Sequence, residues 1–256
     1  MKKEFFDKMV EEIKEKGVLI KISGGALAAQ SGNPYLNRNL QHIVREICLA
    51  YETMENPRIA VVVGGGNIWR GKQGRAFGIR GASSDEIGML ATIINAHVIY
   101  NMLVLKLGSD KVRLMLTSTG APTEIYNREE AKKSLGRGKI VVLGGGIGEP
   151  FVSTDYAAVN RAASLELGVV LMAKDGAAGV YDKDPDEGNA KKYATLNYND
   201  FIDAQLQVAD GTAIMLARDR LIPLFFFDFS LESILKKIIE GEATGTLVAD
   251  VPTTFE

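Results

Sequence analysis

Ile59-Ala60-Val61-Val62-Val63 runs directly into Gly64-Gly65-Gly66-Asn67, and Ile140-Val141-Val142-Leu143 runs into Gly144-Gly145-Gly146-Ile147-Gly148. Each apolar, β-branched run predicts a buried strand, and the glycines after it predict a tight turn toward a helix. Such turns allow backbone amides to approach phosphate oxygens closely. A third apolar run, 18–22, carries Lys21 near its end, just before Ser23-Gly24-Gly25. Together the two loops and the lysine predict a site for two phosphorylated ligands, as in a phosphotransferase.

The rest of the chain predicts strands that alternate with helices. We expect strands at 18–22, 58–63, 112–117, 139–143, 169–173, 222–227 and 246–249. We expect helices at 3–16, 36–54, 85–104, 127–135, from Ser153 onward, and at 198–206, 212–220 and 230–240. Such alternation favours an α/β fold, a three-layer αβα sandwich around a mostly parallel central sheet. Ligands of these sheets bind beyond the carboxyl ends of the strands, where Lys21 and both glycine loops fall. The segment 64–84 is predicted to be a long loop and a candidate lid.

Composition narrows the class of protein. The 256 residues are 46% hydrophobic and 24% charged, with a formal net charge of −2, which disfavours a nucleic-acid binder that works by phosphate neutralisation. We find no apolar run near the roughly 20 residues of a membrane span, and no apolar signal core in Met1–Gly17, so we expect a cytoplasmic protein without membrane contact. No polar linker divides the chain. We therefore expect a helical extension over 1–17 and a single nucleotide-binding domain over 18–256.

Several familiar motifs are disfavoured. Gly66-x4-Gly71-Lys72-Gln73 resembles a P-loop, but Gln73 stands where a magnesium-binding Ser or Thr is needed. Neither glycine run fits the G-x-G-x-x-G of dinucleotide-binding folds. His42 and His97 lie in apolar helical patterns without metal-ligand spacing, so both are interpreted as structural and no metal held by protein ligands alone is expected. Trp69 and the run 225–227 are interpreted as core.

The charged candidates each allow two interpretations. Lys21 is either a solvated lysine at a strand end or a cation that offsets charge on a transferred phosphoryl group. Arg70 is either a surface arginine or a planar fork for phosphate, and Asp155 is either a helix cap or a functional acid. The charged residues of the next loop are either solvated or part of the site: Lys174, Asp182 and Asp184.

Taken together, certain segments resemble the amino-acid kinase superfamily and, within it, the bacterial uridylate (UMP) kinases. They occur in the family's order and cover residues 18–250. The most specific are an acidic-x-x-Gly-Met-Leu-Ala-Thr segment and a Pro-Phe-x-Ser/Thr-Thr-Asp segment. The matching segments are Lys21-Ile22-Ser23-Gly24, Val63–Gly71, Asp85-Glu86-Ile87-Gly88-Met89-Leu90-Ala91-Thr92, Gly148–Ala158, Gly179-Val180-Tyr181-Asp182-Lys183-Asp184-Pro185 and Leu216-Ala217-Arg218-Asp219.

The resemblance implies transfer of a phosphoryl group from Mg-ATP to UMP, giving ADP and UDP for pyrimidine nucleotide biosynthesis. Catalysis would rest on Lys21 and Arg70, which stabilise the transferred group, and on Asp155, which orients Lys21 and lies near Mg²⁺. Asp210 matches a functional acidic position less securely. The residues implied for ATP are Lys21, Ile22, Ser23, Gly24, Gly66, Arg70, Asp175, Tyr181 and Asp184. Those implied for UMP are Gly65, Asp85, Ile147, Gly148, Glu149, Pro150, Phe151, Val152, Ser153 and Thr154. The family also implies a homohexamer, with GTP as activator and UTP as inhibitor.

Four departures from the family pattern leave alternatives open. Gly25 replaces a glutamate, Ile147 a threonine, Glu149 an asparagine, and Ala177-Ala178 a Val-Asp pair. A carboxylate at Glu149 would repel the UMP phosphate unless it turned away or met an arginine. One alternative is therefore a kinase of the same fold that acts on a carboxylate or carbamate. The other is a catalytically weakened nucleotide-binding or sensor protein.

Overall fold

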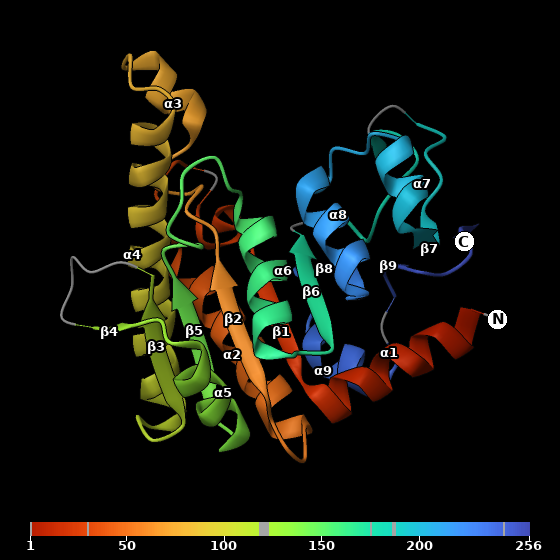
Figure 1. Cartoon of the computed structure of the whole chain (residues 1–256), viewed down its shortest axis with the longest axis horizontal. Coiled ribbons are helices and arrows are strands. Elements are labelled where there is room, and N and C mark those ends of the chain that lie inside the picture. The colour runs from red at the N-terminus through yellow and green to blue at the C-terminus, as the bar shows by residue number, and fades with distance from the viewer. Residues whose placement is uncertain (1, 30, 118–122, 175, 186–187, 243) are drawn as a thin grey trace.

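The computed structural model describes the chain except residues 1, 30, 118–122, 175, 186–187 and 243. The strands of the described residues form one ten-stranded sheet in the order β10-β7-β9-β8-β6-β1-β2-β5-β3-β4 (Figure 1). Their bounds are β1 Val18–Ile22, β2 Ile59–Val63, β3 Val112–Leu116, β4 Glu124–Ile125, β5 Ile140–Gly144, β6 Val169–Lys174, β7 Tyr193–Asn197, β8 Leu224–Asp228, β9 Thr246–Ala249 and β10 Thr254–Phe255.

The centre of the sheet is parallel and buried. Strands β8, β6, β1, β2, β5 and β3 pair in parallel, and Lys21 of β1 lies in register between Val62 of β2 and Met172 of β6. Antiparallel pairing occurs where β9 joins β8 and where β10 joins β7. The apolar runs of the central strands suit this position because helices cover both of their faces.

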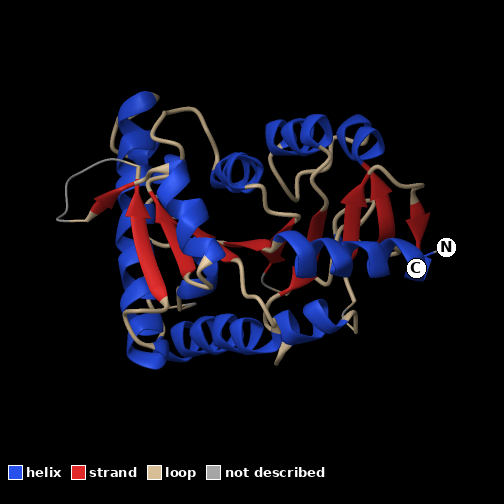
Figure 2. Ribbon diagram, turned by 60° about the horizontal axis from the view of Figure 1, so that its bottom comes forward, coloured by secondary structure: helices blue, strands red, loops and turns tan. Residues whose placement is uncertain are grey.

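Helices cover both faces of the sheet (Figure 2). Helices α5, α6, α7 and α8 lie on one side, and α2, α4 and α9 lie on the other. The predicted three-layer αβα sandwich is therefore confirmed. The bounds are α1 Lys2–Lys16, α2 Asn37–Thr53, α3 Gly71–Ala76, α4 Ala82–Leu107, α5 Arg128–Gly136, α6 Thr154–Leu165, α7 Tyr198–Asp203, α8 Gly211–Arg220 and α9 Ile234–Glu240, with a 3₁₀ turn η1 over Gly24–Leu27.

The amino-terminal helix α1 packs on the body of the fold. It contacts α9 and β6 and buries an apolar stripe formed by Met9, Val10 and Ile13. The Phe6 ring meets the Phe225 ring edge-on, with centroids 5.7 Å apart. The hydrophobic contacts of this stripe hold the helix against the sheet layer.

Three local expectations are wrong. The segment 64–84 is not one loop, because 71–76 forms the short helix α3. Trp69 is half-exposed rather than core: its Nε1 donates to Ser84 Oγ at 3.1 Å. The sequence also does not predict strands β4, β7 and β10, which lie toward the two edges of the sheet; β4 and β10 have only two residues each.

Helix α4 is longer and more continuously apolar than expected. In length and composition it would suffice to cross a membrane, a test that core helices of α/β proteins also pass. One side of it contacts β2, β3, β5 and α2, and its buried residues include Ala91, Ile93, Ala96, Ile99 and Leu103. We therefore interpret α4 as a helix of the fold with one apolar side left exposed.

Candidate active site

A buried ion pair lies at the carboxyl edge of the sheet. Lys21, the fourth residue of β1, places its Nζ 2.6 Å from Asp155 Oδ1, and the two side chains are only 9% and 13% exposed. Burial by itself raises the pKa of the Asp155 carboxyl, but the positive charges of Lys21 and Lys174 outweigh it and hold that pKa below its ordinary value. Asp155 is therefore ionised near neutral pH and keeps the Lys21 ammonium at this point.

Asp155 is fixed by the ends of two helices. It lies in the first turn of α6, where Ser153 caps the helix by accepting a hydrogen bond from the Tyr156 amide at 3.0 Å. The Ser153 hydroxyl donates in turn to the carboxylate of Asp210, and the Asp210 amide donates to Asp155 Oδ2 at 3.3 Å. Asp210 itself caps α8 through the Thr212 amide. This arrangement places Asp210 beside the ion pair, although its match to the family's functional acidic position is the less secure one.

Lys174 is a second lysine at the same edge. It ends β6, the strand beside β1, and its Nζ donates to the Val208 carbonyl at 2.5 Å. Burial lowers the pKa of Lys174 to about 8; the nearby Asp155 carboxylate opposes this shift and the Lys21 charge adds to it. The sequence allows either a solvated or a functional role for Lys174. Its position at the end of an apolar strand matches that of Lys21.

The first glycine loop is held by buried amides. Asn95 of α4, fully buried, donates from Nδ2 to the Gly64 carbonyl and to Asn67 Oδ1, both at 2.7 Å. Its own Oδ1 accepts from the Tyr35 hydroxyl at 2.8 Å and from Asn67 Nδ2 at 3.1 Å. A Cβ atom at Gly24 would lie 2.5 Å from the amide nitrogen of Gly66, so this loop and the turn after β1 touch backbone to backbone.

Arg70 follows the first loop and folds back over it. Its Nε donates to the Gly66 carbonyl at 2.7 Å, which places the guanidinium at the loop rather than in solvent away from it. A Cβ atom at Gly25 would lie 3.7 Å from Arg70 Nη2. The missing glutamate at that position therefore bears on Arg70.

The second glycine loop uses left-handed backbone. Gly145, Gly146 and Gly148 have φ values of +85°, +61° and +91°, a region that glycine enters at little cost. Thr117 Oγ1 lies 2.9 Å from the Gly146 carbonyl, and Arg161 Nη2 donates to the same carbonyl at 3.0 Å. The Gly145 amide donates to Thr92 Oγ1 of α4 at 2.9 Å. Helix α4 thus contacts both loops.

A cavity of about 210 Å³ lies between the two loops. Six of the ten residues expected on the UMP side line it: Gly65, Asp85, Glu149, Val152, Ser153 and Thr154. Four do not: Ile147, Gly148, Pro150 and Phe151. The Phe151 amide nevertheless donates to Asp85 Oδ2 at 2.9 Å, while its ring is 77% exposed and its φ is +63°. Glu149 lines the cavity and is exposed to solvent.

Only some of the residues expected to bind ATP lie close to the glycine loops. Ser23 and Gly24 lie at the start of η1, against the first glycine loop. Tyr181 pairs as an isolated bridge with Lys192, and neither Tyr181 nor Asp184 lines the cavity. Asp175 lies outside the described residues.

Further residues line the cavity that the sequence did not assign to it. They are Gly66, which the resemblance assigned to ATP, and Trp69, Gly71, Ser84, Gly88, Met89, Thr92 and Gly146. Gly88, Met89 and Thr92 belong to the same helix segment as Asp85, and their spacing of three to four residues places them on one face of α4. That helical periodicity is the sequence signal that could have placed Gly88, Met89 and Thr92 beside Asp85. No local sequence pattern places Trp69 at the cavity.

The comparisons with known proteins agree with this geometry. The model of the amino acid kinase family matches residues 16–228. Uridylate kinase of Frankia alni is 40% identical over 238 residues, covering 92% of this chain and 91% of the relative, and uridylate kinase of Frankia casuarinae is 39% identical over 242 residues, covering 93% and 92%. Among solved structures, UMP kinase from Bacillus anthracis superposes with a TM-score of 0.89 at 40% identity, covering 93% of this chain and 98% of that one. UMP kinase from Ureaplasma parvum has a TM-score of 0.84 at 28% identity, covering 91% and 97%.

The chain therefore belongs to the amino acid kinase family. Within that family, its curated relatives at about 40% identity are named uridylate kinases over nearly their whole length.

Proposed function

We propose that this protein is a nucleoside monophosphate kinase that transfers a phosphoryl group from Mg-ATP to UMP. The observation that carries the proposal is the buried Lys21–Asp155 pair, set where two glycine loops meet at the carboxyl edge of the sheet. The names and the near-complete coverage of the relatives support UMP as the acceptor. Phosphoryl transfer requires mainly that the reactants are positioned and that the charge of the transition state is stabilised. A fixed cation and aligned amides supply both.

In this proposal Lys21 and Arg70 act on the transferred group. Lys21 is buried and held by an ionised carboxylate, so its ammonium keeps one position as charge develops on the phosphoryl oxygens. Arg70 donates a hydrogen bond from Nε to the Gly66 carbonyl, and its terminal nitrogens would bind phosphate oxygens. Asp155 positions Lys21. Gly66, Ile22, Ser23 and Gly24 would form the backbone surface for the ATP phosphates.

The acceptor side of the proposal is the cavity between the loops. Asp85 would accept hydrogen bonds from the UMP ribose hydroxyls, and its contact with the Phe151 amide already orients it. Ser153 and Thr154 lie at the start of α6, where free amides and the helix dipole favour a phosphate. Of the other expected residues, Ile147, Gly148, Pro150 and Phe151 would shape the uracil side and Tyr181, Asp184 and Asp175 the ATP base and ribose.

Magnesium would arrive with ATP. The Asp155 and Asp210 carboxylates, joined through the Asp210 amide, provide the hard oxygen donors that Mg²⁺ prefers, so the residues fit the ion. When bound, Mg²⁺ would neutralise charge on the phosphates.

The assembly around this site is also a proposal. We infer one domain over 18–256 with α1 as a packed extension, in a cytoplasmic homo-oligomer of hexameric size that responds to GTP and UTP. Support for association comes from Leu90 and Ile94, exposed by 54% and 48% one turn apart on α4. Sedimentation velocity of the wild type and of Ile94→Glu tests it: a smaller species is expected for the variant, and a monomeric wild type would contradict the inference.

The decisive experiment is ADP production from Mg-ATP with UMP, CMP, dUMP, GMP, carbamate, aspartate and acetylglutamate as acceptors. Turnover restricted to UMP is the expected result. Turnover of a carboxylate or carbamate instead would mean that Ile147 and Glu149 have changed the acceptor. No ADP production with any of the acceptors would favour a nucleotide-binding protein without kinase activity.

Three variants test the assigned roles. Lys21→Met and Arg70→Ala should lower kcat by at least about 100-fold with little change in KM for UMP, because their charge matters most in the transition state. Asp85→Asn should mainly raise KM for UMP. An effect of either cation on KM alone, or unchanged UMP affinity in Asp85→Asn, would contradict the corresponding role.

A further inference from the structure

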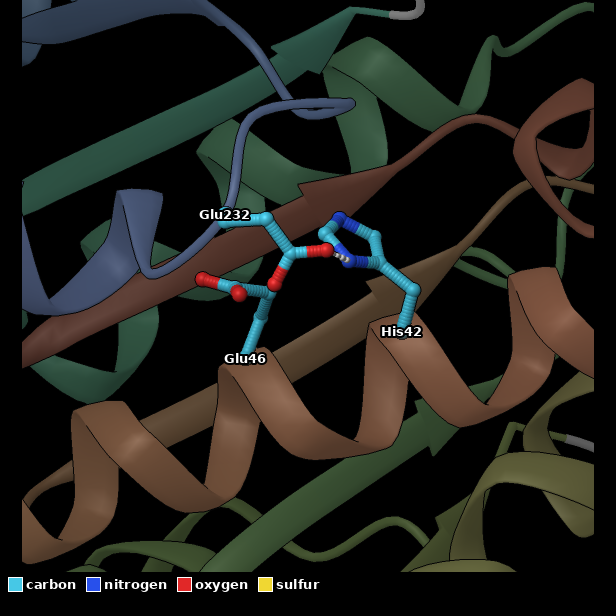
Figure 3. Close-up of side chains that lie close together, drawn as sticks. All are labelled: His42, Glu46 and Glu232. Carbon is cyan, nitrogen blue, oxygen red and sulfur yellow. Dashed lines mark ion pairs between the residues drawn. The ribbon is translucent and has the colours of Figure 1, made fainter.

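A second cluster of ionisable side chains lies away from the reaction edge. His42 and Glu46 occupy adjacent turns of one face of α2, and Glu232 lies on the segment between β8 and α9 that packs against them (Figure 3). One ligand atom of each residue lies within 4.8 Å of the others. His42 and Glu232 also line a cavity of about 910 Å³, larger than the cavity between the glycine loops, so solvent ions reach the cluster.

The tautomer of His42 is set by its surroundings. His42 Nε2 lies 2.6 Å from the Phe229 carbonyl oxygen, an acceptor only, so Nε2 carries the proton and donates. In the neutral ring Nδ1 is then left with its lone pair. That lone pair faces Arg45 Nη2 at 3.1 Å and lies 4.0 Å from Glu232 Oε1. A histidine whose second nitrogen donates to a backbone carbonyl has the orientation that metal-ligating histidines commonly show.

Glu46 is a buried acid that interacts with the charge of Arg45 at a distance, without an ion pair between them. Its side chain has no exposed surface, and within the described parts of the chain it forms no ion pair. Its oxygens accept from the Ser233 amide at 2.8 Å and the Leu235 amide at 3.2 Å, which fixes the carboxylate at the start of α9. Each oxygen keeps a further lone pair, and a buried carboxylate is stabilised by a nearby positive charge.

We propose that His42, Glu46 and Glu232 bind a divalent first-row transition cation of the Zn²⁺ type. One imidazole nitrogen with two carboxylates suits Zn²⁺, with water completing the shell, whereas Mg²⁺ prefers oxygen ligands throughout. The site needs two adjustments. Arg45 must move away, because its Nη2 lies 3.1 Å from His42 Nδ1 and pairs with Glu232, and Glu232 must approach, because ligand atoms around Zn²⁺ lie closer together than the present 4.0 Å between His42 Nδ1 and Glu232 Oε1. Glu232 is 71% exposed and free to rotate inward once it leaves its ion pair with Arg45.

Binding would join α2 to the segment that follows β8. Phe229 lies between the two sites: its carbonyl contacts His42, and its amide donates to the Lys174 carbonyl at 2.7 Å. A cation that fixes His42 therefore fixes the backbone beside a lysine of the reaction edge. The proposal itself concerns binding and does not depend on which acceptor the enzyme phosphorylates.

The test is Zn²⁺ affinity, measured by competition with a chromophoric chelator in buffer that holds millimolar Mg²⁺. Saturable binding of one Zn²⁺ per chain is expected, weakened at least about tenfold in His42→Gln and in Glu232→Gln. The matched control is His97→Gln, which replaces the other histidine of the chain and should leave affinity unchanged. Arg45→Gln should bind Zn²⁺ more tightly, because Glu232 loses the partner that competes for it.

Cobalt gives a second measurement on the same variants. Co²⁺ bound to the wild type should show visible d–d absorption that His42→Gln lacks. Glu232 is exposed, so Glu232→Gln should fold even if His42→Gln does not. Absence of saturable Zn²⁺ binding, displacement of Zn²⁺ by millimolar Mg²⁺, or equal affinity in Glu232→Gln and the wild type would each overturn the proposal.

Discussion

The two glycine loops look alike in the sequence and are built differently in the fold. The first, 64–66, follows β2 in a conformation without positive φ, and its tightest position is Gly65, where an added Cβ would lie 2.7 Å from the Gly88 carbonyl oxygen, whereas a Cβ at Gly66 would meet Arg70 Nε at 3.7 Å. The second, 145–148, follows β5 with three left-handed glycines; Gly146 has open space where a side chain would be, while a Cβ atom at Gly148 would lie 2.6 Å from Thr117 Cγ2. Gly65 of the first loop therefore requires glycine for space alone, whereas Gly145, Gly146 and Gly148 of the second loop require it for backbone conformation.

Their supports differ as well. The first loop depends on Asn95, a buried amide whose donors and acceptor are all used. The Gly146 carbonyl of the second loop accepts from Arg161 and lies 2.9 Å from the Thr117 hydroxyl, whose one proton it shares with the Gly144 carbonyl at 3.1 Å. We expect single substitutions to be more harmful at the first loop than at the second. Four variants, ordered by the size of their expected effect, test this difference.

Gly65→Ala should have the largest effect. Its Cβ would lie 2.7 Å from the Gly88 carbonyl oxygen and 2.8 Å from the Ala91 Cβ, both on α4, so either the loop or the helix must shift. A shift of about 1 Å at a reaction site costs on the order of 100-fold in rate. Steady-state kcat/KM for UMP measures it. Wild-type kinetics in this variant would show that the first loop is not tightly packed.

Asn95→Ala comes second. It leaves the Gly64 carbonyl and the Asn67 amide without their buried partner, a loss of about 2–3 kcal/mol in the free energy of unfolding. Urea unfolding measures the loss. Asn101→Ala on the same helix is the control, since Asn101 is exposed and bonds only within its own helix. Equal losses in the two variants would contradict a special role for Asn95.

Gly146→Ala should cost less. No atom lies within 4 Å of the added Cβ, so the cost is that of placing alanine at φ +61°, about 1 kcal/mol. The urea midpoint should fall slightly while kcat/KM stays within a few-fold of the wild type. A loss of activity as large as in Gly65→Ala would remove the distinction between the loops.

Thr117→Val should have the smallest effect. It removes the hydroxyl near the Gly146 carbonyl, but Arg161 still donates there, and the Thr117 amide still donates to the Gly144 carbonyl at 3.0 Å. The free energy of unfolding should fall by less than about 1 kcal/mol. The double variant Thr117→Val/Arg161→Met should lose more than the sum of the single losses, because only then does Gly146 lack a side-chain donor; strict additivity would refute the shared support.

The sequence predicted the central strands because they are continuous apolar runs, a signal that does not depend on their partners. It did not predict β7 and β10: both are paired by segments some 50 residues away in the chain, and such pairing leaves little local trace. Likewise it predicted that Lys21 and Asp155 act together only through family resemblance. Their contact spans β1 and α6, and no local pattern encodes it.

By itself, the sequence determined the αβα class, the glycine turns and the lysine at a strand end, because periodicity and backbone freedom are local properties of the chain. Only the tertiary structure decided that Glu149 and Trp69 line the cavity, that Asn95 holds the first loop, and that His42 lies beside two carboxylates. These facts depend on which distant residues share a space, which is set when helices pack on the sheet.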